Sequence, residues 1–396
     1  MFRRLTYIFC RLLFRLFDPF ILAGIPRGKP SETVLLLRID SLGDYILFRE
    51  SLWALRQAPR LAGRRVILCA SAALEDFAKT FDTGAFDEFL PFEVAKFYTS
   101  LRYRYAFLRK ISALGIELAL QPTFSRTYEG DLLIKASRAR ERIGFDSPPK
   151  NTSRVMKKIT DRWYSELAPA PSGFPFELSS NRYFADYMQA PATSLEHVTS
   201  ELLNELSTKL EPRLRFYLGK PLFCIGAVHS ARRWPLHYFV ELAVYLEKNY
   251  HRVSIWTGNE ADRKSLADSR VKLPSSSINL VGQLSLVELA LFMSSAPFVV
   301  ANESMAPHMA VMLRVPVVVI SNGQHLGRFS PYPRALAPFY TAVYPENIAT
   351  DVEAVIPRYY NRVVRSRQPI AGISVERVAE SLLSLLKGIY GHGFCR

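Results

Sequence analysis

Short apolar runs alternate with helix-like segments along most of the chain, and this alternation limits the possible folds more than any other feature. The first run, residues 33–39, is almost continuously apolar, which is typical of a strand buried on both faces of a parallel sheet. Further strand candidates in the first half are residues 65–69, 88–90 and 116–120. Strands and helices that alternate across short loops predict βαβ units.

A second series of the same kind begins after residues 165–220, a stretch that contains several prolines, is polar at 191–211 and suggests an interdomain connection. Its strand candidates are residues 222–226, 253–256, 278–281, 297–300 and 315–320. A length of 396 residues is enough for two or three domains. We therefore predict an α/β fold with two Rossmann-like, doubly wound domains that face a central cleft. The expected domains are residues 31–205 and 206–396, preceded by a basic segment at residues 1–30.

Positive charge is concentrated in two segments of the chain. The formal net charge is +15. Residues 1–30 hold six basic side chains and one acidic one, a net +5, and residues 96–164 hold fifteen and six, a net +9. These two segments account for +14 of the total, which predicts an anionic partner at this part of the protein. An anionic membrane surface and a nucleic acid both fit such a charge.

The first segment favours the membrane. If the segment is helical, its apolar side chains lie on one face; these are Phe2, Leu5, Ile8, Phe9, Leu12, Leu13 and Leu16. Arg4, Arg11 and Arg15 fall on the opposite face, a pattern typical of a helix in the headgroup plane with its arginines toward lipid phosphates. The segment is too often interrupted by charge to span a bilayer. The alternative is an ordinary amphipathic helix packed on the protein's own core.

The loops that follow the predicted strands are the expected place for chemistry, because ligands of such sheets bind at the carboxyl ends of strands. The first of these loops, residues 40–44, contains Gly43, which permits a tight turn, and Asp44 in the first turn of the next helix. Asp44 could serve as a general base or simply cap its helix. Both interpretations are open from the sequence.

Three loops of the second series carry polar groups. Arg232 and Arg233 precede a helix opened by Pro235, which predicts a phosphate site unless they are ordinary surface arginines. Glu260 follows the next strand and could accept the hydroxyls of a ribose or cap a helix. Ser304 and His308 lie at the start of a further helix, where an anion would be stabilised. A lone histidine in a helix is more often structural.

Several common patterns are missing from the sequence. It contains no dinucleotide-binding or P-loop glycine pattern, no G-x-S-x-G and no H-E-x-x-H. Its four cysteines lie far apart, so neither a disulfide framework nor a structural zinc site is expected. With no D-x-D pair to hold a metal on a diphosphate, we expect arginines and helix N-termini to neutralise the phosphates.

These loops, in this order, resemble glycosyltransferase family 9, the lipopolysaccharide heptosyltransferases. The segments that carry the resemblance are RIDSLGD at 38–44, RIGFD at 142–146, RRWP at 232–235, GNE at 258–260 and NESMAPHMA at 302–310. They are similar to the family's R-x-S-S-L-G-D turn, a recurrent first-domain segment, its K-x-W-P phosphate loop, its G-x-x-E segment and its N-D-[ST]-G-x-x-H-x-A loop. Two positions differ from the last pattern: Glu303 stands at the aspartate and Met305 at the glycine.

The resemblance implies a GT-B fold and an inverting, metal-independent transfer of a heptose from an ADP-heptose donor to a lipopolysaccharide core or similar lipid-linked saccharide. It implies that the enzyme uses no cofactor and works in the cytoplasm, peripherally on the inner membrane face. The residue that matches the catalytic base is Asp44. Those that match the donor contacts are Arg232, Glu260, Glu303, Ser304 and His308, with Arg233 beside them. His325 and Arg328 stand where many members have a turn near the donor.

Two other functions remain open from the sequence. Met305 favours a catalytically degenerate protein that binds a nucleotide sugar and has a scaffolding role in envelope glycan assembly. The charge alone would also suit a nucleic-acid-binding protein, which predicts salt-dependent binding. We expect no nucleic-acid partner, because the amphipathic N-terminal segment favours a membrane.

Overall fold

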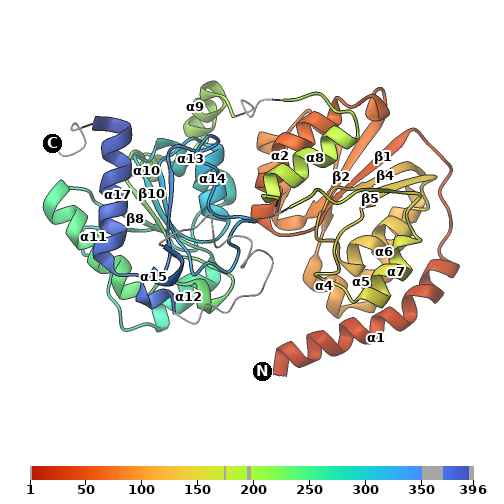
Figure 1. Cartoon of the computed structure of the whole chain (residues 1–396), viewed down its shortest axis with the longest axis horizontal. Helices are drawn as coiled ribbons and strands as arrows, with labels where there is room; N and C mark the ends of the chain where they lie inside the picture. Colours follow the sequence, from red (N-terminus) through yellow and green to blue (C-terminus); the bar gives the residue numbers. More distant parts are fainter. Residues whose placement is uncertain (1, 174, 194–197, 350–368, 392–396) are drawn as a thin grey trace. The chain divides into compact units, whose positions relative to one another are not determined.

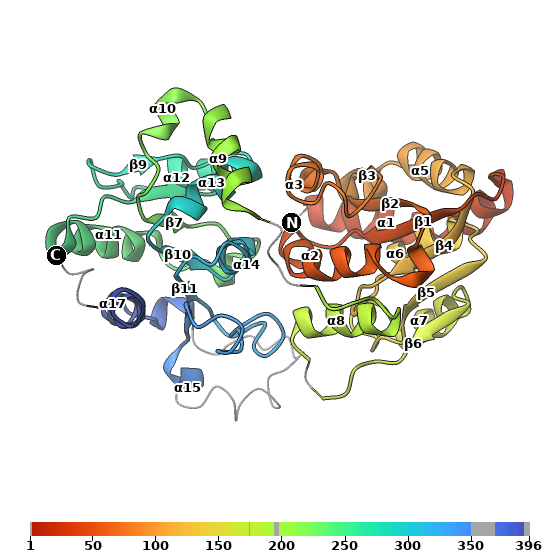
Figure 2. The same ribbon diagram turned by 90° about the horizontal axis from the view of Figure 1, so that it is seen from above.

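The computed structural model describes residues 2–173, 175–193, 198–349 and 369–391, with side chains from Leu13 onward except at residues 347 and 349. The predicted helical faces at Phe2, Leu5, Ile8, Phe9 and Leu12, and at Arg4 and Arg11, therefore lie outside the described side chains. The chain forms two compact units, Met1–Ser172 with Glu177–Ser194, and Gly173–Phe176 with Leu195–Arg396. Figures 1 and 2 show each unit as a sheet covered by helices.

The first unit contains a six-stranded parallel sheet in the order β3-β2-β1-β4-β5-β6. Its strands are β1 (Thr33–Arg38), β2 (Arg65–Ser71), β3 (Glu88–Phe92), β4 (Ile116–Gln121), β5 (Glu141–Phe145) and β6 (Glu166–Ala168). Its helices are α1 (Phe2–Gly24), α2 (Leu42–Arg56), α3 (Glu75–Phe81), α4 (Val94–Thr99), α5 (Leu101–Ala113), α6 (Tyr128–Ala136), α7 (Arg154–Asp161) and α8 (Glu177–Tyr187). All six side chains of β1 are buried, as its continuous apolar run predicts.

Helices cover both faces of this sheet. α4 to α7 lie on one face, and α2 and α8 lie on the other (Figure 1). The first group contributes Phe107, Leu108 and Leu132 to a core shared with Leu35 and Ile67 of the strands. α1 runs along the outer side of α4 and α5 and is an additional layer of this unit.

The second unit repeats this topology. Its parallel sheet has the order β12-β11-β10-β7-β8-β9, which is the same arrangement when its strands are counted from one to six. The strands are β7 (Leu222–Cys224), β8 (Ile255–Thr257), β9 (Ile278–Asn279), β10 (Val299–Asn302), β11 (Val317–Ile320) and β12 (Tyr340–Val343). The helices are α9 (Ser200–Lys209), α10 (Pro212–Arg215), α11 (Leu236–Tyr250), α12 (Glu260–Asp268), α13 (Leu286–Ser295), α14 (Met305–Met312), α15 (Glu346–Ala349) and α17 (Val375–Tyr390).

The two-sheet α/β prediction is confirmed, and the stretch at residues 165–220 is more ordered than expected. It contains the edge strand β6 and helix α8, which packs on α2 and belongs to the first unit. Ser285 and Glu288 have capping-box spacing in the sequence, and the structure has this capping box at the start of α13. Among the described residues, no helix is both long and apolar enough to cross a bilayer.

Candidate functional site

Each sheet has one switch point, a pair of neighbouring strands from which the chain continues toward opposite edges of the sheet. In the first unit this switch point lies between β1 and β4, and in the second it lies between β7 and β10. Loops that leave the carboxyl ends of such neighbouring strands diverge and form a ligand-binding crevice. The predicted site residues Asp44, Arg232 and Glu303 all lie in or directly after the loops at these two points.

Arg38 is the centre of the polar network at the switch point of the first unit. It is the last residue of β1 and is fully buried. Its Nη1 donates to the carbonyl of Pro122 at 3.0 Å and to Oδ1 of Asn181 at 2.9 Å. Its Nη2 donates to the carbonyl of Asp44 and to Oε1 of Glu177, both at 3.2 Å. Arg38 therefore holds the loop after β4, the start of α2 and helix α8 together.

Asp44 itself closes a capping box at the start of α2. Its Oδ2 accepts hydrogen bonds from the backbone N–H of Ser41, at 3.1 Å, and from the Ser41 hydroxyl. The side chain is half-buried. The capping interpretation therefore holds, and since both bonds end on one oxygen, it does not conflict with proton transfer at the other.

Asp40 is a second carboxylate on this turn. Its Oδ1 lies 3.0 Å from Nε of Arg38, and its side chain is 22% exposed. Burial is the main cause that raises the pKa of Asp40 to about 8; Arg38 opposes the rise, whereas the charges of Asp44 and Glu177 add to it. Burial alone would lower the pKa of Arg38, but these three carboxylates outweigh it and raise that pKa. The turn can thus hold one proton close to Asp44 at neutral pH.

At the switch point of the second unit, Arg232, Glu303 and His325 form one cluster. Nη1 of Arg232 donates to the carbonyl of Glu303 at 3.3 Å and lies 3.5 Å from Nδ1 of His325. The same His325 nitrogen pairs with Oε1 of Glu303, and the Ser321 hydroxyl donates to Oε2. Burial opposes the charge of Glu303, but His325, Ser321 and Arg232 together lower its pKa. Burial lowers the pKa of Arg232 despite the attraction of Glu303.

Asn302 fixes this cluster to the sheet. It is the last residue of β10 and is fully buried. Its Oδ1 accepts from the backbone N–H of Trp234 at 2.9 Å, and its Nδ2 donates to the carbonyl of Ile225 at 2.8 Å. Asn322 also joins the loops, because its Nδ2 donates to the carbonyl of Ala231 at 2.9 Å. Hydrogen bonds therefore join the loops after β7, β10 and β11.

The other predicted donor residues have different surroundings. Arg233 pairs with Asp262 at 3.0 Å and donates to the carbonyl of Ala227 at 2.9 Å, so it connects the loop after β7 to α12. Glu260 is half exposed and forms an ion pair with Arg263 of its own helix at 2.7 Å, and the hydrogen bond from Arg263 lowers its pKa. Arg232 therefore lies beside Glu303 and His325, whereas Arg233 and Glu260 pair with other residues.

The remaining predicted residues lie on two segments. Ser304 and His308 belong to the start of α14, and Arg328 lies in the loop after β11. Ser304 is the N-cap of α14 and accepts from the N–H of Ala306 at 3.4 Å. His308 is buried, and its Nδ1 lies 2.9 Å from the hydroxyl of Tyr332. The Arg328 guanidinium stacks on Phe329, 4.6 Å from the ring centroid.

Comparisons with known proteins show a resemblance to one family and a shared fold. The family model "Glycosyltransferase family 9 (heptosyltransferase)" matches residues 179–344. The resemblance to glycosyltransferase family 9 is confirmed. No curated protein matches the chain.

Solved structures extend the likeness to both units. A glycosyltransferase family 9 protein from Veillonella parvula is 15% identical, covers 91% of this chain and 98% of its own, and gives a TM-score of 0.63. ADP-heptose lps heptosyltransferase II from E. coli is 17% identical, with 90% and 99% covered and a TM-score of 0.59. E. coli heptosyltransferase WaaC with ADP is 14% identical, with 89% and 99% covered and a TM-score of 0.60. The two-domain GT-B fold is thus shared with glycosyltransferase family 9 structures.

The positions that differ from the family 9 pattern can now be examined. Met305 is the first helical residue of α14, and it is not among the described residues with positive φ. The backbone freedom of a glycine is therefore unnecessary at this position. Gly43, for which we expected a tight turn, is a buried residue inside α2, and its φ is likewise not positive. That expectation was wrong, because the turn is made by residues 39–41 before the helix begins.

Sequence reasoning assigned no role to several residues of these two networks, including Arg38 at the centre of the first one. Asn302 and Asp40 were within the quoted motifs but had no role assigned. Glu177 and Asn181 lie in α8, more than one hundred residues from Arg38, so no local pattern could reveal them. A carboxylate at position 40, where the family pattern has serine, was the one available signal. Among the described residues, no group of three or more His, Cys, Asp or Glu side chains could hold a metal ion.

Proposed function

We propose that the protein is an inverting, metal-independent glycosyltransferase. In this proposal a nucleotide sugar of the ADP-heptose type donates a heptose or related sugar to a lipopolysaccharide core or similar lipid-linked saccharide. The observation that supports it best is the cluster of Arg232, Glu303 and His325 at the switch point of the second unit. A buried guanidinium beside a helix start is suited to a diphosphate.

The proposed donor-binding residues are Arg232, Arg233, Glu260, Glu303, Ser304 and His308. Arg232 contacts the diphosphate and stabilises the charge that develops on the leaving nucleoside diphosphate. Its positive charge supports a mechanism without a metal on the phosphates. The choice of an adenosine nucleotide rests on two solved structures of E. coli heptosyltransferase WaaC, one with ADP and one with ADP-2-deoxy-2-fluoro heptose.

Asp44 is the proposed catalytic base. It accepts the proton of the acceptor hydroxyl while that oxygen attacks the anomeric carbon and the bond from this carbon to the diphosphate oxygen breaks. Attack from the face opposite the leaving group inverts the anomeric configuration. Arg38 holds the backbone of Asp44 through its carbonyl and so positions the base.

The cellular place that fits this substrate is the cytoplasmic side of the inner membrane, with the protein bound peripherally. A lipid-linked acceptor is anchored in that membrane, and the first unit carries most of the net positive charge. We expect no nucleic-acid partner.

The function is tested by incubating the full chain with a panel of nucleotide sugars and a lipid-linked heptose acceptor, with and without a chelator. We expect transfer from ADP-heptose that the chelator does not reduce. Transfer from a uridine or guanosine nucleotide sugar alone would contradict the donor, and loss of transfer with the chelator would contradict metal independence. Nucleotide binding with no turnover across the panel would instead favour the degenerate, scaffolding protein, the alternative that Met305 supports.

A further inference from the structure

Helix α1 is attached to the first unit through its charged side. Asp18 is buried, and its two carboxylate oxygens accept from Nε and Nη2 of Arg104, each at 2.7 Å. The hydroxyl of Tyr128 donates to the same carboxylate at 2.9 Å. Arg15 pairs with Glu129 at 3.0 Å, and its guanidinium lies 4.3 Å from the ring centroid of Tyr128. The polar face of α1 therefore faces the protein.

The end of α1 is also fixed. The guanidinium of Arg138 donates to the carbonyls of Leu22 and Ile25, and the hydroxyl of Ser112 donates to the carbonyl of Pro26 at 2.8 Å. Ile25 is buried in the same core as β1 and α5. These contacts hold α1 in one orientation on the unit, because rotation about its axis would break a buried ion pair.

This orientation leaves an apolar face in solvent. Leu16 is 68% exposed and Phe20 is 77% exposed, with Phe17 at 42% and Leu13 at 37%. A surface helix normally buries its apolar residues and exposes its polar ones, whereas α1 buries Asp18 together with Phe14 and leaves this second apolar stripe in solvent. A contiguous exposed apolar patch of this kind marks an interaction surface.

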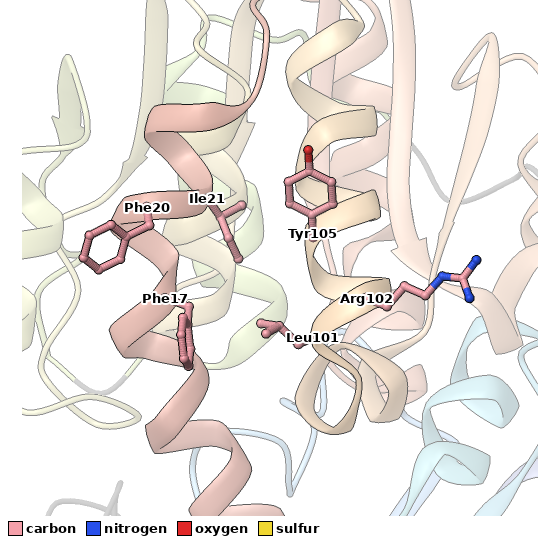
Figure 3. Close-up of a pocket in the computed structure, with 6 residues that line it drawn as sticks. All are labelled: Phe17, Phe20, Ile21, Leu101, Arg102 and Tyr105. Carbon is pink, nitrogen blue, oxygen red and sulfur yellow. The ribbon is translucent and has the colours of Figure 1, made fainter.

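The apolar face continues onto α5. A pocket of about 340 Å³ lies between the two helices. Figure 3 shows the residues that line it, which are Phe17, Phe20, Ile21, Leu101, Arg102 and Tyr105. Ile21 and Leu101 point into the space between the helices, and Arg102 points away from α1 (Figure 3). The pocket is open and almost wholly apolar, which suits an acyl chain better than a polar ligand.

The charge around this face is positive. Arg102, Arg109 and Lys110 of α5 are exposed. α5 contains no acidic residue, and the single acidic residue of α1 is the buried Asp18. An apolar ridge beside exposed cations is complementary to an anionic bilayer, where acyl chains lie beneath phosphate headgroups.

We propose that α1 and α5 form a membrane-docking surface for anionic lipid. Leu13, Leu16, Phe17 and Phe20 enter the acyl region of one leaflet, and Arg102, Arg109 and Lys110 bind the phosphates of its headgroups. This differs from the sequence prediction, in which Arg15 pointed to the lipid; Arg15 is instead paired with Glu129. The proposal gives a surface to the peripheral association proposed above and does not depend on the sugar or the nucleotide.

The test is co-sedimentation of the full chain with vesicles of phosphatidylcholine alone or mixed with phosphatidylglycerol. The ridge variant is Leu16→Glu with Phe20→Glu, and the matched control is Phe216→Glu, an 82% exposed apolar residue in the second unit. We expect the wild type and the control to bind the anionic vesicles, and the ridge variant to bind at least about tenfold more weakly. Arg102→Glu with Arg109→Glu should remove the preference for anionic lipid, and added salt should weaken it.

Equal binding of the ridge variant and the wild type, or no binding of the wild type to anionic vesicles, would overturn the proposal. So would a wild-type dimer that the ridge variant converts to a monomer, because a second copy would then cover this face. Circular dichroism shows whether each variant is folded. Transfer to a short, soluble saccharide acceptor should be unchanged in the ridge variant, so a failure of docking is distinguished from a failure of the proposed transferase activity.

Discussion

The two units share one strand order but hold opposite chemistry at the same topological position. Between β1 and β4, Arg38 is the only described cation of the network, and it is fully buried and paired. The carboxylates Asp40 and Asp44 lie on the turn that follows β1 and at the start of α2. Between β7 and β10, the carboxylate of Glu303 is buried and held by His325, and Arg232 lies beside it. Topology therefore fixes where a site forms, and the side chains after the strands decide whether it handles a proton or an anion.

Replacing Asp44 should give the largest effect, a loss of transfer activity. If the first switch point handles the proton, Asp44→Ala should reduce the rate of sugar transfer by about 10² to 10⁴. Steady-state transfer assays with saturating donor measure this loss. Ser41→Ala is the matched control, because it removes one capping bond to Asp44 but leaves the carboxylate. Near-normal turnover of Asp44→Ala would show that this residue is a helix cap and nothing more.

Replacing Glu303 should lower the free energy of unfolding. Glu303→Gln leaves the buried Arg232 and the partly exposed His325 without their carboxylate, which should cost about 3 kcal/mol of unfolding free energy near pH 7. Since the pKa of Glu303 is lowered by folding, its stabilisation is present above its unfolded pKa near 4.5 and is lost as the pH falls through its folded value. Urea unfolding at several pH values should show the difference from wild type shrink in acid. A constant difference would mean that Glu303 is not ionised.

Asp40 should show the opposite pH dependence. Because folding raises its pKa to about 8, the folded state holds a proton that the unfolded state loses near pH 4, so the stability from this group falls as the pH rises between those values. Asp40→Asn removes this pH dependence. The free energy of unfolding of the variant, relative to that of the wild type, should therefore rise by more than about 1 kcal/mol between pH 4 and pH 8. Parallel stability curves for the two proteins would show that Asp40 titrates normally.

The smallest effect is expected at Met305. Met305→Gly restores the family residue but places glycine at the first helical position of α14, which should cost no more than about 1 kcal/mol. Because Met305 needs no positive φ, nucleotide affinity should change little. Thermal unfolding and a nucleotide titration measure the two quantities. A large gain in affinity or turnover would mean that the methionine side chain obstructs the donor and would support the degenerate alternative.

Much of the fold could be predicted because buried parallel strands have a strong local signal. The continuous apolar runs of β1 and β11 gave their positions, and the capping-box spacing gave the start of α13. The strands β5, β6 and β12 were missed because each has only three to five residues and none contains a long apolar run. Helix α8 was hidden in a stretch with several prolines, and only its packing on α2 places it in the first unit.

The site was predictable where one loop carried several polar residues. Asp44 and Arg232 come after β1 and β7, so the rule that ligands bind at the carboxyl ends of strands pointed to them as candidates. The partners of Arg38 were not predictable, because Asn181 and Glu177 come from a distant helix. His325 was named as a residue near the donor, but its pairing with Glu303 was not foreseen. The orientation of α1 depended on one buried pair, Asp18 with Arg104, between helices 86 residues apart.

A calorimetric titration of ADP into the wild type, Asp44→Ala and Arg232→Ala tests the central claim most directly, that the first switch point handles the proton and the second holds the nucleotide. The account predicts equal affinity for the wild type and Asp44→Ala, and at least about tenfold weaker binding for Arg232→Ala. Weaker binding of Asp44→Ala than of Arg232→Ala, or binding that neither change affects, would contradict it.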